Sequence, residues 1–248
     1  GADWGAAVIA SEQFQQAIAG AGLPVPEVIH GDGTLYRFST NGKRMDQSGW
    51  YVLHDDGDVP AGAFGCWRSG LSQTWCSKDT QAMTQAERSA HQQRMQAIAQ
   101  QREADKAQRQ HDAATAAAQR WEAAEPAPAD HPYLAKKGVH AHGTRVESDG
   151  FLIVPMRDTN GKLWNIERIN PANFKDKKGL LGGRRTGLYY SIGKPKGVLI
   201  VCEGFATGAS IHEATGDAVA VAFNAGNLRE VAQALHSKYP KLRLILAA

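Results

Sequence analysis

The chain has 248 residues and a formal net charge of +3, so it has room for two small domains or one large one, and its charge alone does not indicate a nucleic-acid partner. It contains no apolar run near the roughly 18 residues that span a bilayer, and its first residues lack the pattern of a signal peptide. We therefore expect no membrane partner. Three cysteines form no disulfide framework, so we expect a protein of the reducing cytoplasm.

Residues 1–80 are expected to form a small domain built on an antiparallel sheet. Four strand-like segments, TLYRFS, GWYVLH, AGAFGCW and SQTWCS, are separated by turn signals such as Asn41-Gly42 and Asp56-Gly57. We expect core packing for most of the aromatic residues, which are Tyr36, Phe38, Trp50, Tyr51, Phe64, Trp67 and Trp75. Others could stack on unpaired bases, with phosphates bound by the nearby cations Arg37, Lys43, Arg44, Arg68 and Lys78.

The same segment contains His54, Cys66 and Cys76, which raises the question of a zinc site. Structural zinc sites favour paired ligands at short spacing, such as C-x2-C, and the segment has no such pair. We therefore expect a sheet that folds without zinc.

Residues 81–129 are expected to form a long helical linker. The stretch from Met83 to Glu125 is rich in Ala, Gln and Arg, contains no Gly or Pro, and ends at Pro126-Ala127-Pro128. Its few large apolar residues form no continuous face, and its positive and negative charges balance. This pattern favours a solvent-exposed spacer over a DNA-binding helix, with a weak antiparallel helix pair as the alternative if the chain turns midway.

Residues 130–196 are expected to form a basic, β-rich subdomain. HPYLAKKGV is typical of a short helix, FLIVPMRD and KLWNIERI of a hairpin around Thr159-Asn160-Gly161, and LYYSIG of a third strand. Ten basic and three acidic residues lie between Arg157 and Lys196, a local net charge of +7. The loop FKDKKGLLGGRRTG combines cations with flexible glycines, as a phosphate-binding loop does; a solvated hairpin loop is the alternative.

Residues 197–248 alternate strands and helices in the manner of parallel βαβ units. Apolar strands are predicted at Val198–Val201, Ala218–Phe223 and Leu242–Ala247, and Asn227 is a plausible N-cap of the second helix. Glu203 directly follows the first strand. A carboxylate at the carboxyl end of a buried parallel strand is costly unless a cation or a basic group pairs with it, so Glu203 is a candidate metal ligand. The alternative is an ordinary doubly wound sheet in which Glu203 only caps the next helix.

The segment VLIVCEGFATGASIHEATGDAVAVAFNAGNL, followed by KLRLILAA, resembles the TOPRIM domain of plasmid and phage primases. In that family a Glu after the first strand acts in catalysis and metal binding, and the resemblance implies this role for Glu203. An Asp-x-Asp pair after the third strand then holds magnesium. The pair would begin immediately after Ala248, so we expect a TOPRIM domain that is cut at its metal site, and weak or no synthesis by this chain.

The resemblance extends, less specifically, to the rest of the chain. FLIVPMRDTNGKLWNIERI and KGLLGGRRTGLYYSIG are similar to the segment that precedes TOPRIM in these primases. They also resemble, more loosely, the basic subdomain of bacterial replicative primases, where an Arg on the second strand and lysines in the next loop bind template and incoming nucleotide. This implies binding roles for Arg168 and Lys178 and makes their basic neighbours candidate ligands of nucleic acid or nucleotide: Lys175, Lys177, Arg184 and Arg185. The N-terminal sheet lies where such primases commonly carry a zinc ribbon.

The fold class that follows is α+β, with an aromatic antiparallel sheet, a long helical linker, and a β-rich basic subdomain joined to an α/β, Rossmann-like TOPRIM domain. The implied function is that of a DNA primase, a nucleotidyltransferase that makes RNA primers in plasmid or phage replication. Its partners would be single-stranded DNA and ribonucleoside triphosphates, its cofactor Mg2+ or Mn2+, and a replicative helicase domain or protein is a plausible partner.

Two alternatives come from other classes. A TOPRIM nuclease or topoisomerase-like enzyme would cleave DNA, but a topoisomerase needs a nucleophilic tyrosine, and Tyr189-Tyr190 lies in a predicted strand. A non-catalytic module could bind single-stranded DNA through the aromatic sheet.

Overall fold

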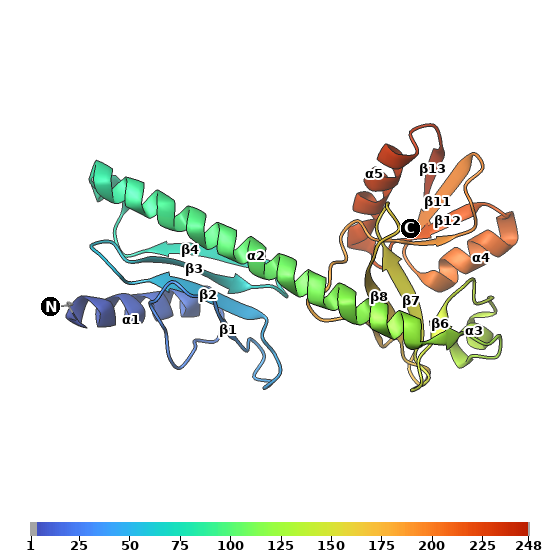
Figure 1. The fold of residues 1–248 in the computed structure, drawn as a ribbon, viewed down its shortest axis with the longest axis horizontal. Helices are drawn as coiled ribbons and strands as arrows, with labels where there is room; N and C mark the ends of the chain where they lie inside the picture. Colours follow the sequence, from blue (N-terminus) through green and yellow to red (C-terminus); the bar gives the residue numbers. More distant parts are fainter. Residues whose placement is uncertain (1–3, 248) are drawn as a thin grey trace. The chain divides into compact units, whose positions relative to one another are not determined.

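The computed structural model describes residues 4–247, and the chain divides into two compact units, Gly1–Asp105 and Lys106–Ala248 (Figure 1). In the first unit, four strands pair antiparallel in the order of the sequence. The strands are β1 (Tyr36–Phe38), β2 (Gly49–His54), β3 (Ala61–Cys66) and β4 (Leu71–Cys76). Helix α1 (Trp4–Gly20) precedes this sheet, and the short helix η1 (Thr80–Ala82) follows it.

The sheet of the first unit has an apolar core on both faces. Side chains alternate along β2, so that Tyr51 and Leu53 pack with Phe14 and Ile18 of α1. Their neighbours Trp50 and Val52 form a second cluster on the opposite face. This arrangement explains why β2 and β3 are buried almost throughout, and it confirms the core role of Trp50, Tyr51 and Phe64.

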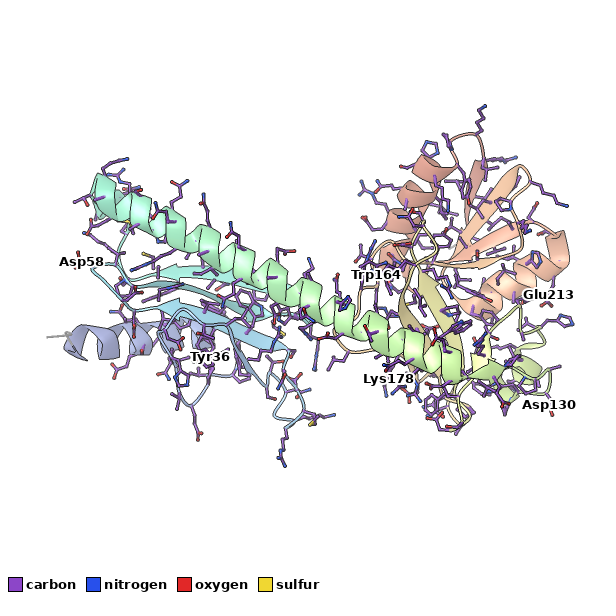
Figure 2. All side chains as sticks on the ribbon, in the orientation of Figure 1. Tyr36, Asp58, Asp130, Trp164, Lys178 and Glu213 are labelled. Atoms are coloured by element: carbon purple, nitrogen blue, oxygen red, sulfur yellow. The ribbon has the colours of Figure 1, made fainter. Side chains whose placement is uncertain are left out.

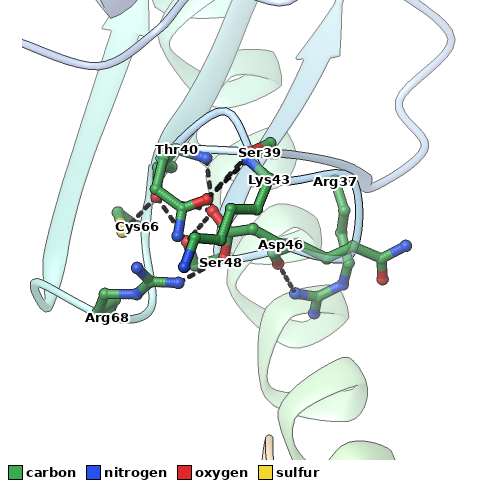
Figure 3. A network of polar contacts seen from close by, with 10 residues as sticks. Arg37, Ser39, Thr40, Lys43, Asp46, Ser48, Cys66 and Arg68 are labelled. Atoms are coloured by element: carbon green, nitrogen blue, oxygen red, sulfur yellow. Dashed lines mark hydrogen bonds and ion pairs between the residues drawn. The ribbon is translucent and has the colours of Figure 1, made fainter.

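The turn between β1 and β2 is organised by one carboxylate, Asp46 (Figure 3). Its Oδ2 accepts hydrogen bonds from the Thr40 backbone N–H at 2.7 Å and from the Ser48 hydroxyl at 3.1 Å, and its Oδ1 pairs with Arg68 at 2.6 Å. Desolvation alone would raise the pKa of Asp46, but these hydrogen bonds and the Arg68 charge outweigh it and hold the pKa at about 2.

Helix α2 (Gln85–Ala123) is more than the solvent-exposed spacer expected from its composition. In the first unit, Ile98 is buried against Trp50 and Val52, and Met95 packs beside it. In the second unit, Ala117 is buried in a cluster that also contains Ile153 and Ile166. The contact of Ala117 is not visible in a pattern of large apolar residues, because an alanine side chain buries a helix face by allowing close approach.

The second unit begins with a five-stranded antiparallel sheet in the order β5-β6-β7-β8-β9. Its strands are β5 (Glu125–Pro126), β6 (Arg145–Val146), β7 (Leu152–Arg157), β8 (Leu163–Ile169) and β9 (Lys177–Gly179), and α3 (Pro132–Lys137) lies between β5 and β6 in the sequence. The predicted hairpin is therefore present as β7 and β8. Part of the expected basic loop is itself a strand, β9.

A second sheet follows in the order β10-β12-β11-β13. Its elements are β10 (Tyr190–Ile192), β11 (Val198–Cys202), α4 (Phe205–Thr215), β12 (Ala218–Val221), η2 (Ala225–Asn227), α5 (Leu228–Lys238) and β13 (Arg243–Ala247). Strand β11 pairs in parallel with both β12 and β13. Strand β10 corresponds to the predicted segment LYYSIG and pairs antiparallel with β12. Tyr189, the residue before β10, forms an antiparallel bridge with Arg157 of β7 and so joins this segment to the basic sheet.

The two sheets of the second unit share one apolar core. The hydrophobic packing therefore continues across the boundary expected between residues 196 and 197. Ile200 and Val219 of the second sheet lie in the same cluster as Leu152 and Val154 of β7. Phe205 and Ala209 of α4 belong to this cluster, whereas α5 covers the other face of the second sheet. At Gly208 of α4, an added Cβ would lie 2.8 Å from Val221 Cγ2 and 3.0 Å from Cys202 Sγ, so the helix approaches the sheet at this glycine.

The packing of α2 is tested by Ile98→Ala. We expect this variant to destabilise the first unit by about 2–5 kcal/mol, because it removes most of a fully packed side chain. Hydrogen-exchange mass spectrometry at increasing urea concentrations measures the protection of the amides in β2 to β4 separately from those of the second unit. The matched control is Gln96→Ala on the exposed side of the helix, for which we expect a change within about 0.5 kcal/mol. Equal stability of the two variants would mean that α2 is a spacer after all.

Candidate functional site

Glu203 lies at the carboxyl edge of the second sheet. It directly follows β11, the strand between β12 and β13, and its side chain is exposed. Gly204 comes next, with an extended backbone and no side chain to cap the N-terminus of α4. The backbone N–H groups at this end of the helix carry partial positive charge, which favours an anion beside Glu203. Phe223 follows β12 at the same edge in a left-handed conformation with φ of 70°.

A second carboxylate, Glu167 on β8, faces the same region from the basic sheet. Its exposed fraction is 4%, and its Oε1 lies 3.8 Å from Arg185 Nη2. Burial raises the pKa of Glu167, the positive charges of Lys177 and Arg185 oppose this shift, and the negative charge of Glu203 adds to it. The structure thus places two carboxylates and two cations in one electrostatic environment.

The sequence reasoning missed Glu167, although a signal was available. Within LWNIERI, the alternation of side chains puts Glu167 on the same face as Asn165 and Ile169, and all three are buried. A charged residue at a buried position of a strand needs partners, and such positions are frequent at functional sites.

The predicted basic residues separate onto different faces of β8 and β9. Lys177 lies on the Glu167 side, where its Nζ is 3.3 Å from the Tyr133 hydroxyl. Lys178 is the next residue along the strand and is paired in register with Arg168, on the opposite face. Lys178 is exposed and its Nζ lies 2.7 Å from Asp176 Oδ1 (Figure 2).

Three other predicted residues have different surroundings. Arg168 pairs with Glu147 and Asp149, and its guanidinium carbon lies 4.1 Å from the centroid of the Phe151 ring. Arg184 stacks on Trp164, with its guanidinium carbon 5.1 Å from the ring centroid. Lys175 is exposed in the connection between β8 and β9. Of the six predicted cations, Lys177 and Arg185 are therefore the pair whose charges act on Glu167.

Two buried asparagines hold the segment between β9 and β10, which was expected to be a flexible loop. Asn165 Oδ1 accepts a hydrogen bond from the Leu180 N–H at 2.9 Å, and its Nδ2 donates to the Arg184 carbonyl at 3.1 Å. An added Cβ at Gly183 would lie 2.4 Å from Asn165 Nδ2, so this glycine permits the close contact.

Asn227 holds the other end of this segment. Its Oδ1 accepts from the Gly187 N–H at 2.8 Å, and its Nδ2 lies within 3.2 Å of the carbonyl oxygens of Arg185, Leu188 and Ala222. Asn227 occupies the N-cap position of α5, as predicted, but its side chain makes no capping hydrogen bond to the helix. The amide instead satisfies backbone groups of a neighbouring segment, which no local pattern reveals.

In the first unit, three of the cations that were proposed to bind phosphates form ion pairs with carboxylates. Of the cations proposed to bind phosphates, Arg37 pairs with Asp105, Arg68 with Asp46 and Lys78 with Glu87. The strand register also separates the residues considered for zinc. Cys66 pairs with Leu71 at one end of β3, whereas Ala61 at the other end lies between His54 and Cys76.

The anchoring role of Asn227 is tested by Asn227→Ala. We expect a destabilisation of about 1–3 kcal/mol, because the substitution leaves buried backbone groups without partners, and we expect faster amide exchange in residues 183–189. Exchange mass spectrometry measures both effects. Gln233→Ala on the exposed side of α5 serves as the control and should change neither quantity. Unchanged exchange in 183–189 would contradict the assigned anchor.

The pKa of Glu167 generates a dependence of stability on pH. Because the folded pKa is raised above the ordinary value of 4.5, Glu167 contributes stability that is fully present below that value and is lost as the pH rises through the folded pKa. Glu167→Gln should therefore lose less stability than the wild type as the pH rises from about 4.5 to neutrality. Urea unfolding at a series of pH values measures the difference. Glu230→Gln, an exposed control on α5, should follow the wild-type profile, and identical profiles for all three proteins would contradict the shift.

Two curated relatives from Escherichia coli, both named DNA primase TraC, are similar to this chain. One is 33% identical over 97% of the chain, and the other is 32% identical over 99% of it. The aligned part is 23% and 18% of the two relatives, respectively, so the chain spans about a quarter of their length or less. No protein-family model matches the chain, and no solved structure matches it. Within the described residues, no helix combines the length and apolar character of a membrane span.

Proposed function

We propose that this chain is part of a DNA primase and contributes to the centre that joins ribonucleotides on a single-stranded DNA template. The observation that carries the proposal is the position of Glu167 within electrostatic range of Lys177, Arg185 and Glu203, in a chain that is similar, over nearly all of its length, to proteins named DNA primase. A TOPRIM identity for the second sheet is part of the same proposal. The parallel pairing of β11 with β12 and β13, and a Glu directly after β11, support it.

In this proposal, Glu203 is the metal ligand. Its carboxylate is exposed at the carboxyl edge of the sheet, and carboxylate oxygens with open positions for water and phosphate suit Mg2+ or Mn2+. The bound ion would neutralise charge that develops on the triphosphate and the leaving pyrophosphate. Glu167 is buried, and its proposed role is to hold Arg185 and Lys177 in place.

The cations divide into two proposed roles. Lys177 and Arg185 lie on the Glu167 side and would bind the triphosphate of the incoming nucleotide. Lys175, just before β9, and Lys178, within it, are exposed and would contact template phosphates. Arg168 is engaged by Glu147 and Asp149, which favours a structural role for it.

A topoisomerase-like reaction is less well supported. Tyr190 is buried in β10 and its hydroxyl donates to the His142 carbonyl, and burial raises the pKa of this tyrosine to about 12. Burial also raises the pKa of Tyr189. A tyrosine that is harder to ionise is a poorer nucleophile, so neither residue is suited to form a covalent bond with DNA.

The proposal is tested by primer synthesis from labelled ribonucleotides on single-stranded DNA, with Mg2+ or Mn2+. Both this chain and the longest protein that contains it are assayed. In whichever protein is active, Glu203→Gln should reduce synthesis by about 100-fold or more, because it removes a charge from the reacting centre. Lys177→Ala and Arg185→Ala should each raise the KM for nucleotide by about 10-fold or more, since a hydrogen bond to a charged group is worth about 1.5–3 kcal/mol.

The matched control is Lys136→Ala, which removes an exposed cation from α3 outside the site and should leave synthesis unchanged. Full activity of Glu203→Gln would exclude the proposed centre. DNA binding without any product in the longest protein would instead favour a binding module, and cleavage of the template would favour a nuclease.

A further inference from the structure

A cluster of metal-ligating side chains lies away from the proposed centre, at the other end of α4. His140 and His142 come from the connection between α3 and β6, and Glu213 comes from the last turn of α4 (Figure 2). One possible ligand atom from each of these residues lies within 4.8 Å of the other two. Within the described residues, this is the group of His, Cys, Asp and Glu side chains that converges closely enough to hold an ion.

The three side chains converge on one carboxylate oxygen. Glu213 Oε1 lies 2.6 Å from His142 Nε2 and 3.2 Å from His140 Nδ1, and it also accepts a hydrogen bond from the His140 backbone N–H at 2.9 Å. A tetrahedral zinc ion with bonds of about 2.0–2.1 Å to its ligands separates the ligand atoms by about 3.3 Å. The His140–Glu213 distance already agrees with this value, and the His142–Glu213 pair needs to open by roughly 0.7 Å.

The chemistry of the set favours zinc. Two imidazole nitrogens and one carboxylate oxygen are ligands that Zn2+ accepts, whereas Mg2+ and Ca2+ prefer oxygen alone. The side chain of His140 is 81% exposed, which leaves the fourth position open to water. A cation here also lies at the C-terminal end of α4, where the helix dipole favours positive charge.

The surroundings hold the ligands in place. The His142 backbone carbonyl accepts a hydrogen bond from the Tyr190 hydroxyl of β10. The His142 ring lies edge-on to the His212 ring, with centroids 5.4 Å apart. His212 is itself fixed by a 2.7 Å contact between its Nδ1 and the Asp217 carbonyl. These contacts fix the backbone of His142 and one side of its ring.

We propose that His140, His142 and Glu213 form a zinc site that fastens the connection after α3 to the C-terminal end of α4. The site is separate from the proposed reaction at Glu203, which precedes the N-terminal end of the same helix. Its role is structural: a bound ion replaces direct hydrogen bonds between a loop and a helix with coordinate bonds and so limits movement of α4.

The test is a titration of the purified, chelator-treated chain with ZnCl2 by isothermal calorimetry, repeated with CoCl2 to record the absorption of a tetrahedral cobalt site. We expect one equivalent to bind and thermal unfolding to shift to higher temperature with zinc. His142→Ala and Glu213→Gln should weaken binding by at least about 100-fold and remove this shift. His140→Ala should also weaken zinc binding and remove the thermal shift. Because it changes an exposed side chain, this variant tests the site even if one of the other two fails to fold.

Two controls separate this site from other ligands. His236→Ala, which removes an exposed histidine from α5, and the double variant Cys66→Ser, Cys76→Ser should bind zinc as tightly as the wild type. Absence of zinc binding by the wild type, or binding that survives all three site variants, would overturn the proposal. Because the readout is binding and not primer synthesis, the outcome does not depend on the proposed function.

Discussion

The arrangement of the proposed centre depends on the burial of two asparagine side chains. The segment between β9 and β10 carries Arg184 and Arg185, and much of it lacks strand partners of its own. Its backbone groups nevertheless need hydrogen-bond partners where they are buried. Asn165 supplies them at one end and Asn227 at the other, and Arg185 is thereby held beside Glu167. The position of a charged group is thus set by uncharged ones.

The secondary structure follows closely from local pattern. The alternation of apolar residues in GWYVLH and the apolar run VLIV correspond to β2 and β11, and the turn signals between segments lie where the strands end. Glu203 was identifiable as a candidate for the same reason, because its proposed role derives from its place directly after a buried strand. A residue whose environment is determined by the five or six residues before it can be recognised without a structure.

The features that were missed all depend on register or on contacts distant in the sequence. Lys177 and Lys178 are neighbours with the same charge, and only the pairing of β9 with β8 shows that one faces Glu167 and the other Arg168. The partner of β10 is β12, which lies beyond β11 in the sequence. The buried alanines of α2 resemble the exposed alanines of a spacer, since composition does not show which face of a helix meets a sheet.

The close approach at Gly208 has a consequence for how this region can vary. Most contacts between a helix and a sheet are made by side chains, and a change in one is accommodated by shifts in its neighbours. At Gly208 the helix backbone approaches the side chains of Cys202 and Val221, so a larger residue requires a shift of these side chains or of α4. A shift of α4 would change the direction in which its N-terminus leaves Gly204, the residue directly after Glu203. We therefore regard Gly208, four residues after Gly204, as a constraint on the position of α4 relative to Glu203. Substitutions elsewhere in the helix would leave this constraint intact.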